Sequence, residues 1–133
     1  MHSCFGQLDT LTASNSLGDW EALASDNGLY VSKVQHSGNL VVQRLATSDK
    51  WNSNSHTGIT NGPFELRLKP NNELVILDKS DAVIWSSGTE INHPLSSTGY
   101  VKLQNDGKLI IYRGDGVPLW QNGHLLKGNI LIS

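Results

Sequence analysis

The sequence repeats one pattern three times: a short aliphatic run that is followed, at a fixed distance, by a tryptophan. Trp51, Trp85 and Trp120 each lie 12 residues after the first residue of such a run, and successive tryptophans are 34 and 35 residues apart. A small polar pair follows at the same place each time, as in Ser53-Asn54. A fixed period of this size indicates repeated supersecondary units that bury one face together.

Period-two alternation within each repeat predicts short antiparallel strands joined by turns rich in Gly and Asn. Only 17% of the residues are charged, below the usual quarter, and 13 are Gly. These features favour an all-β fold, with three sheets that turn their tryptophans into one core about a pseudo-threefold axis. We expect a single domain of residues 1–133, with repeats at roughly 27–55, 61–88 and 98–123.

The two ends of the chain lie outside the repeats. In residues 1–26 a helix over 16–24 is conceivable, but Gly18 is unfavourable inside it, so short strands or loop are expected. Residues 128–133 end in an apolar strand that needs a pairing partner, within the chain or in a second copy. This strand is therefore the candidate for homodimerisation by strand exchange. Cys4 is the only cysteine, which excludes an intrachain disulfide, and Trp20 lies outside the tryptophan register.

Charge and motif content exclude several classes of function. The formal net charge of −2 offers no field for nucleic acid or an anionic membrane. No apolar run approaches the ~20 residues of a membrane span, and the N-terminus lacks the features of a signal peptide, so cytoplasmic location or secretion without a classical signal both stay open. The scattered His residues and the missing acid–base constellation predict a protein that is not an enzyme and that needs no metal or cofactor.

The third repeat presents a polar set on one face. Residues two apart share a face of a strand. This places Gln104, Asp106, Lys108, Ile110 and Tyr112 together, while their alternates serve the core. Amide, carboxylate and phenol groups match the donors and acceptors of sugar hydroxyls, and an aliphatic side chain can lie against the C–H patch of the ring. The sequence therefore predicts a shallow carbohydrate site, whose weak affinity calls for several sites together.

Over about residues 27–123 the chain resembles the monocot-type (bulb-type, snowdrop-lectin-like) mannose-binding lectins. Their signature, Gln-x-Asp-x-Asn-x-Val-x-Tyr, occurs once per repeat. The resemblance implies a β-prism II fold of three antiparallel four-stranded sheets and frequent exchange of C-terminal strands in dimers. It also implies that the Gln, Asp, Asn and Tyr side chains hold mannose hydroxyls while the Val packs on the ring.

The signature is altered in every repeat. The third repeat keeps Gln104, Asp106 and Tyr112, with Lys108 in place of Asn and Ile110 in place of Val. The first repeat keeps three signature residues and has Ser and Gln at the other two positions: Gln35, Ser37, Asn39, Val41 and Gln43. The second keeps only its Val, and we expect it to be degenerate for mannose: Lys69, Asn71, Glu73, Val75 and Leu77.

Two alternatives stay open. A β-trefoil also has three repeats, although its Gln two positions before Trp is missing here and repeats near 34 residues are short for it. In function, the altered signatures leave room for a lectin-fold protein with degenerate sugar sites that acts as a protein-binding, inhibitory or toxic module. The favoured hypothesis is a non-enzymatic lectin for mannose or mannose-containing glycans, multivalent through dimerisation and able to agglutinate.

Overall fold

The computed structural model describes residues 8–18, 21–47, 50–55, 57–89, 98–122 and 124–125. The described chain consists of short strands and one 3-10 helix, η2 (Ile59–Asn61). No helix within these residues is long and apolar enough to cross a membrane. The strands are β1 (Thr10–Thr12), β2 (Ser16–Leu17), β3 (Leu23–Ala24), β4 (Tyr30–Val34), β5 (Leu40–Arg44), β6 (Lys50–Asn52), β7 (Glu65–Leu68), β8 (Leu74–Leu77), β9 (Val83–Ser86), β10 (Tyr100–Leu103), β11 (Leu109–Tyr112), β12 (Pro118–Gln121) and β13 (His124–Leu125).

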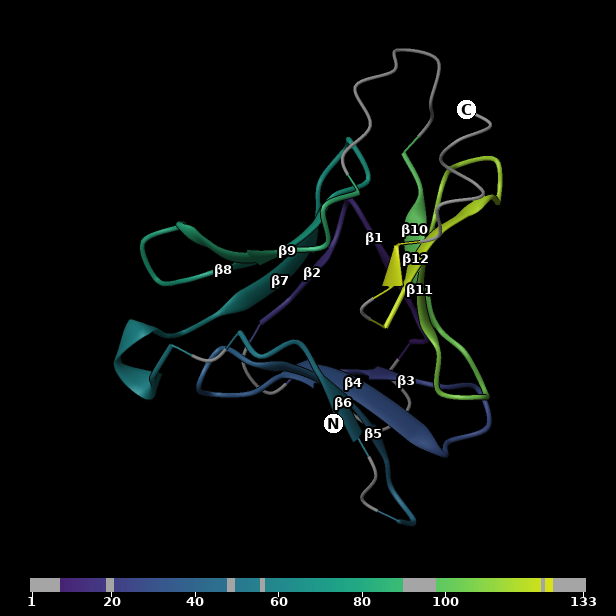
Figure 1. The fold of residues 1–133 in the computed structure, drawn as a ribbon, viewed down its shortest axis with the longest axis horizontal. Helices are drawn as coiled ribbons and strands as arrows, with labels where there is room; N and C mark the ends of the chain where they lie inside the picture. Colours follow the sequence, from purple (N-terminus) through teal and green to yellow (C-terminus); the bar gives the residue numbers. More distant parts are fainter. Residues whose placement is uncertain are drawn as a thin grey trace.

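Three antiparallel sheets form the sides of a triangular prism (Figure 1). Their strand orders are β3-β4-β5-β6, β2-β7-β8-β9 and β1-β10-β11-β12-β13, and we call them the first, second and third sheet after the repeats that build them. The predicted all-β architecture is thereby confirmed. The third sheet carries a fifth, short strand, because the chain turns back after Trp120 and pairs Gln121 with His124.

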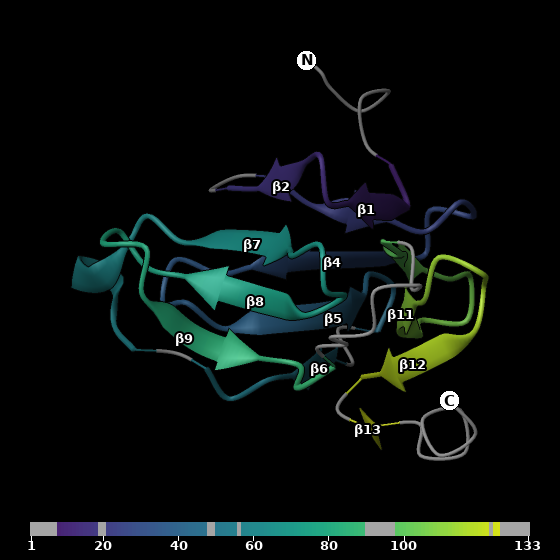
Figure 2. The ribbon, with the colours of Figure 1, turned by 90° about the horizontal axis from the view of Figure 1, so that it is seen from above.

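The lead-in supplies one edge strand to each sheet. β1 pairs with β10, β2 with β7 and β3 with β4, so the first described residues pass along all three sides of the prism. Figure 2 shows β1 and β2 at one end of the prism and β9, β12 and β13 toward the other. Among residues 8–18 and 21–26 the regular elements are therefore short strands, in agreement with the expectation of short strands or loop.

The inward faces of the three sheets and their tryptophans make one core. The ring of Trp120 is buried and contacts Trp51 and Trp85 edge-on, with 5.8 Å between ring centroids in both pairs. The three indoles therefore meet near the pseudo-threefold axis, in agreement with their register in the sequence. The alternates predicted to serve the core are fully buried: Leu103, Leu109 and Ile111.

Close packing joins each turn to the following sheet. A Cβ at Gly38 would lie 3.0 Å from the Phe64 ring, and one at Gly107 would lie 2.5 Å from the Tyr30 ring, so both turns need glycine for space as well as for positive φ. In the second repeat the glycine is on the other side of the contact. Asn72 occupies the turn position, and its Oδ1 accepts a hydrogen bond of 2.6 Å from the N–H of Gly99, which precedes the third sheet.

Three features singled out from the sequence lie outside the described residues. These are Cys4, Trp20 and the C-terminal strand at 128–133. The strand-exchange hypothesis therefore stays a prediction.

Candidate functional site

Each predicted site lies on a turn between the first two long strands of its sheet, and a polar clasp holds the base of that turn. In the first repeat, Ser53 Oγ accepts from the Leu40 N–H at 3.1 Å, and Ser55 Oγ donates to the Gly38 carbonyl at 2.8 Å. The two hydroxyls are themselves 2.5 Å apart. The clasp fixes the backbone on both sides of Asn39, the third position of the signature.

The same clasp recurs in the other two repeats. Ser87 and Thr89 take the places of the two serines, with bonds of 3.0 Å from the Leu74 N–H and 2.6 Å to the Asn72 carbonyl. In the third repeat Asn122 does both tasks. The small polar residues that follow each tryptophan in the sequence therefore hold the turns that carry the signature residues.

In the third repeat, contacts join four of the predicted site residues in two pairs, Gln104 with Tyr112 and Asp106 with Lys108. Gln104 follows β10, Asp106 lies in the turn, and Ile110 and Tyr112 belong to β11. The Gln104 amide donates to the Tyr112 phenol, which holds these two side chains together. The Asp106 carboxylate accepts from the Lys108 backbone N–H at 3.1 Å and stands half-exposed.

Lys108 makes only a long contact with Asp106, and the Asp106 carboxylate stays exposed. Its Nζ is 3.9 Å from Asp106 Oδ2, and the two side chains are 51% and 56% exposed. An ion pair that is so long and so exposed contributes little, about 0–1 kcal/mol. Lys108 can therefore turn away from Asp106 when another acceptor, such as a hydroxyl, comes near.

An aliphatic side chain forms the floor of each predicted site. Val41 and Val75 are fully buried, whereas the larger Ile110 is 7% exposed. All three residues are thus buried, and Ile110 is slightly more exposed than the other two.

In the first repeat, one predicted site residue, Asn39, already makes hydrogen bonds to the clasp. The amide oxygen of Asn39 accepts from the Ser55 N–H at 3.2 Å and from Ser53 Oγ at 3.3 Å. Gln35 and Gln43 stay half-buried at the surface, and Ser37 replaces the carboxylate of the signature. This site keeps amide donors but lacks the strong acceptor of the third site.

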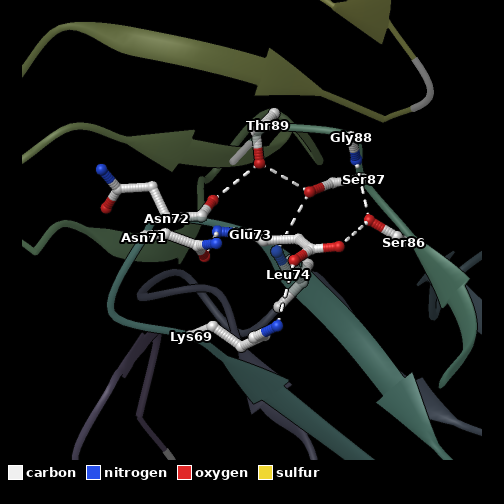
Figure 3. Close-up of polar contacts among 9 residues, drawn as sticks. All are labelled: Lys69, Asn71, Asn72, Glu73, Leu74, Ser86, Ser87, Gly88 and Thr89. Carbon is white, nitrogen blue, oxygen red and sulfur yellow. Dashed lines mark hydrogen bonds and ion pairs between the residues drawn. The ribbon is translucent and has the colours of Figure 1, made fainter. Parts of the chain in front are cut away.

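In the second repeat the charged side chains at the predicted site contact residues of the same repeat (Figure 3). Lys69 Nζ lies 3.3 Å from Glu73 Oε1, and Ser86 Oγ donates to Glu73 Oε2 at 2.6 Å. Both carboxylate oxygens are thus occupied. Asn71 uses its own side-chain oxygen on the Glu73 N–H, at 3.1 Å.

The environment of Glu73 stabilises its charged form. The Ser86 hydrogen bond is the largest effect and Lys69 adds to it, so the pKa of Glu73 is lowered from its ordinary value although burial opposes the shift. Each oxygen of the Glu73 carboxylate already has one partner, and only 13% of the side chain is exposed, so little of it is accessible to a ligand.

Sequence reasoning missed the residues that lie next to the third site. Tyr100 on β10 stacks on Tyr112, with ring centroids 5.0 Å apart and planes at 24°. An open pocket of about 770 Å³ extends from Gln104 and Tyr112 over Tyr100 to Thr10 and Thr12 of β1. Period-two alternation places Tyr100 on the outward face, but the pairing of β10 with β1 has no signal in the local sequence.

No family model matches the chain. A curated relative, the mannose-specific lectin of Aloe arborescens, is 45% identical over 56 residues, which cover 42% of this chain and 48% of the relative. The match therefore spans about half the length of that protein.

Solved structures share the whole fold. A mannose-binding lectin from the monocot Gastrodia elata, described as monomeric, aligns with a TM-score of 0.73 at 26% identity, over 89% of this chain and 99% of its own. The snowdrop (Galanthus nivalis) mannose-specific agglutinin in complex with methyl-α-D-mannoside aligns with a TM-score of 0.67 at 25% identity, over 78% of this chain and 88% of its own. The fold is thus the β-prism II fold, which excludes the β-trefoil alternative.

Proposed function

We propose that this chain is a non-enzymatic lectin that binds mannose or mannose-containing glycans through its third repeat. Its resemblance to the monocot mannose-binding lectins extends over fold, repeats and sequence. The observation that carries the proposal is that the third repeat keeps three polar residues of the signature at its surface, with Gln104 bonded to Tyr112 and Asp106 half-exposed. These groups offer an amide, a carboxylate and a phenol to sugar hydroxyls, as the signature of such lectins does.

The roles of the side chains follow from their chemistry. Asp106 is half-exposed and accepts hydrogen bonds from two hydroxyls, while Gln104 and Tyr112 hold each other in position and each retains a further donor or acceptor. Ile110 contacts the C–H face of the ring. Lys108 replaces the Asn of the signature with a donor that has no acceptor, so it can serve only a sugar oxygen.

The first repeat is the second candidate site. Gln35, Asn39 and Val41 match the signature, but the Asn39 oxygen is engaged by the clasp and Ser37 replaces the Asp. We propose that this site binds more weakly than the third. The second repeat, with Glu73 paired on both oxygens, is proposed not to bind mannose.

Titration with methyl α-mannoside at millimolar concentration, followed by NMR and calorimetry, tests the proposal. We expect saturable binding, loss of the tighter site in Asp106→Ala and Tyr112→Ala, and unchanged binding in Glu73→Gln as the matched control. Far-UV and near-UV circular dichroism verifies that the variants are folded. Absence of saturation in the unaltered protein contradicts the mannose assignment, and binding that survives both site variants contradicts the choice of residues.

A dimer formed by exchange of residues 128–133 is proposed to bring several weak sites onto one particle. Its support is the apolar Ile130-Leu131-Ile132 run, which needs a pairing partner. Since the Gastrodia relative is described as monomeric, the oligomeric state is tested by itself. Sedimentation should show a dimer that becomes monomeric or aggregates when 128–133 are removed, and a dimer unchanged by the truncation refutes strand exchange.

The altered signatures also favour a second candidate, a prism that binds a protein through its outward faces, as an inhibitor or toxin. Its support is the second sheet, where Lys69–Glu73 and Arg67–Glu65 pairs present charges instead of sugar-binding groups. A glycan array with no binding, together with no response to methyl α-mannoside, is the outcome that favours this candidate.

A further inference from the structure

A basic residue lies at the same outward position of all three sheets, opposite the buried aliphatic residue of each predicted site. In the order of the sheets, the pairs are Lys33–Val41, Arg67–Val75 and Lys102–Ile110. Arg67 Nη2 lies 2.7 Å from Glu65 Oε2, and Lys102 Nζ lies 3.9 Å from Asp9 Oδ2. The exposed Lys33 makes no ion pair or hydrogen bond with another described residue. Within the described part of the chain, the cation of the first sheet is therefore the one of the three that lacks a carboxylate partner.

The predicted site of the first repeat also differs from the other two in having no carboxylate. Asp106 of the third site lines an open pocket of about 450 Å³ together with Asp9 and Asp26, and the second site contains Glu73. In the first site, Ser37 takes the position of the signature Asp. The four strands of the first sheet contain no Asp or Glu, and their basic residues are Lys33, Arg44 and Lys50. A surface of one sign attracts ligands of the opposite sign.

The side chains of the first site have hydrogen-bond donors to offer. The amides of Gln35 and Gln43 and the hydroxyl of Ser37 make no hydrogen bond to another described residue. The clasp uses the amide oxygen of Asn39 and leaves its Nδ2 without a partner among these residues. The backbone holds the turn in place, because the Ser37 carbonyl accepts from the Thr57 N–H at 2.7 Å. The first site is therefore rich in donors on a fixed turn.

The Lys33 ammonium is within reach of a ligand at these donors. Lys33 lies directly opposite Val41, which makes it the diagonal neighbour of Asn39 and Gln43. Diagonal neighbours on antiparallel strands are ~7–8 Å apart, a distance that long side chains span. Gln35 follows two residues later on the same face of the strand, ~7 Å along it. A Lys side chain lays its aliphatic stem along the surface and keeps its ammonium in water, so this charge can stand beside the amides.

We propose that the first site prefers an anionic sugar, a ring that carries a carboxylate or a sulfate ester, whereas the third site prefers the neutral sugar. The ammonium of Lys33 and the amide donors form charge-assisted hydrogen bonds with such a group. Ser37 in place of Asp removes the carboxylate that would repel it. This inference rests on the proposed function, because it requires that the outward faces of the prism bind sugars. The chain then carries two sugar specificities on two of its sheets.

Three sugars that differ only at C6 test the preference: methyl α-mannoside, its 6-sulfate and its C6 uronate. They are titrated at low ionic strength, and NMR follows the backbone amides of Ser37 and Asn39 separately from those of Asp106 and Lys108. At the first site at least one anionic sugar should bind about fivefold tighter than methyl α-mannoside, which corresponds to about 1 kcal/mol, the upper range for an exposed ion pair. The advantage should shrink in about 1 M salt, where the Debye length is ~3 Å. A comparison of the sulfate with the uronate identifies the anionic group.

Two variants separate the contributions of the cation and of the missing carboxylate. Lys33→Gln should remove the fivefold advantage of the anionic sugar, whereas Lys102→Gln, at the equivalent place of the third sheet, is the matched control and should leave it unchanged. Ser37→Asp gives the first site the carboxylate of the signature and should reverse its preference in favour of methyl α-mannoside. None of these residues belongs to the core, and circular dichroism verifies that the variants are folded.

The outcomes separate this inference from the proposed function. Equal affinities of the three sugars at the first site, an advantage that survives Lys33→Gln, or binding confined to the third site overturns the inference and leaves the lectin function standing. Binding of an anionic sugar at the first site without binding of methyl α-mannoside at the third supports the inference and contradicts the mannose assignment. Absence of binding for all three sugars overturns the lectin function, and this inference with it.

Discussion

Asn122 is the residue whose replacement best tests how the prism holds its third site. It performs alone the task that two hydroxyl residues perform in each of the other repeats. Its Oδ1 accepts from the Leu109 N–H at 2.5 Å, and its Nδ2 donates to the Gly107 carbonyl at 3.1 Å. Gly107 and Leu109 flank Lys108, so this one amide fixes the backbone on both sides of the site.

The expected cost of Asn122→Ala follows from these contacts. Two part-buried hydrogen bonds contribute about 1–3 kcal/mol together. Asn122 has φ of +21°, and Ala tolerates positive φ less well than Asn, which adds about 1 kcal/mol. The total loss of about 2–4 kcal/mol is large against the ~5–15 kcal/mol that stabilises a typical domain.

Urea unfolding, followed by tryptophan fluorescence, measures this loss. The matched control is Asn52→Ala, because Asn52 is exposed and makes a single local bond, to the Asn54 N–H at 3.0 Å. We expect a few tenths of a kcal/mol for the control. Asn122→Ser should lie between the two, since one hydroxyl cannot replace both bonds and position 124 carries no Ser or Thr. A loss for Asn122→Ala no larger than that of the control would refute the clasp.

Three further predictions concern charge, packing and the signature. Folding lowers the pKa of Glu73 from its ordinary value of 4.5. Its ionised form therefore stabilises the fold at pH values above 4.5, and this contribution is lost as the pH falls through the lower pKa of the folded state. The urea midpoints at pH 7 and pH 3 should differ less in Glu73→Gln than in the unaltered protein. Gly99→Ala should destabilise by about 3 kcal/mol or more, because its Cβ would lie 1.7 Å from the Tyr112 carbonyl oxygen, whereas Gly18→Ala, with its nearest atom at 3.5 Å, should be nearly neutral in the same assay. Lys108→Asn restores the signature and should strengthen methyl α-mannoside binding severalfold by calorimetry, and an unchanged affinity would show that Lys108 already serves the sugar.

The regular part of the fold was predictable because its determinants are local. Alternation located the long strands, and the common register of Trp51, Trp85 and Trp120 placed all three indoles at one axis. The same alternation separated the outward Gln104 and Tyr112 from the inward Leu103 and Leu109. Period and register suffice for this because each repeat has the same plan.

The rest depends on contacts between residues far apart in the sequence. The lead-in reads as an irregular segment, and only its pairing with β10, β7 and β4 makes it three edge strands. The Ser86 hydroxyl that completes the pairing of Glu73 is 13 residues away from it. The clasp residues were recognisable in the sequence as small polar pairs after each tryptophan. Their role could not be predicted, because they bond to turn residues about 13 positions earlier in the chain.

The three repeats separate what the fold requires from what a ligand requires. The inward aliphatic residues, the tryptophans and the clasps keep their roles in all three sheets, even where Asn122 replaces two hydroxyl residues with one amide. The outward positions differ from sheet to sheet: a paired Glu73, an Asn39 bound to its clasp, and a half-exposed Asp106 beside Lys108. The outward polar positions lie outside the core, so these changes leave the packing of the prism intact. The differences between the three outward surfaces are therefore not required by the fold, and the proposed sugar site of the third repeat gives a reason for them.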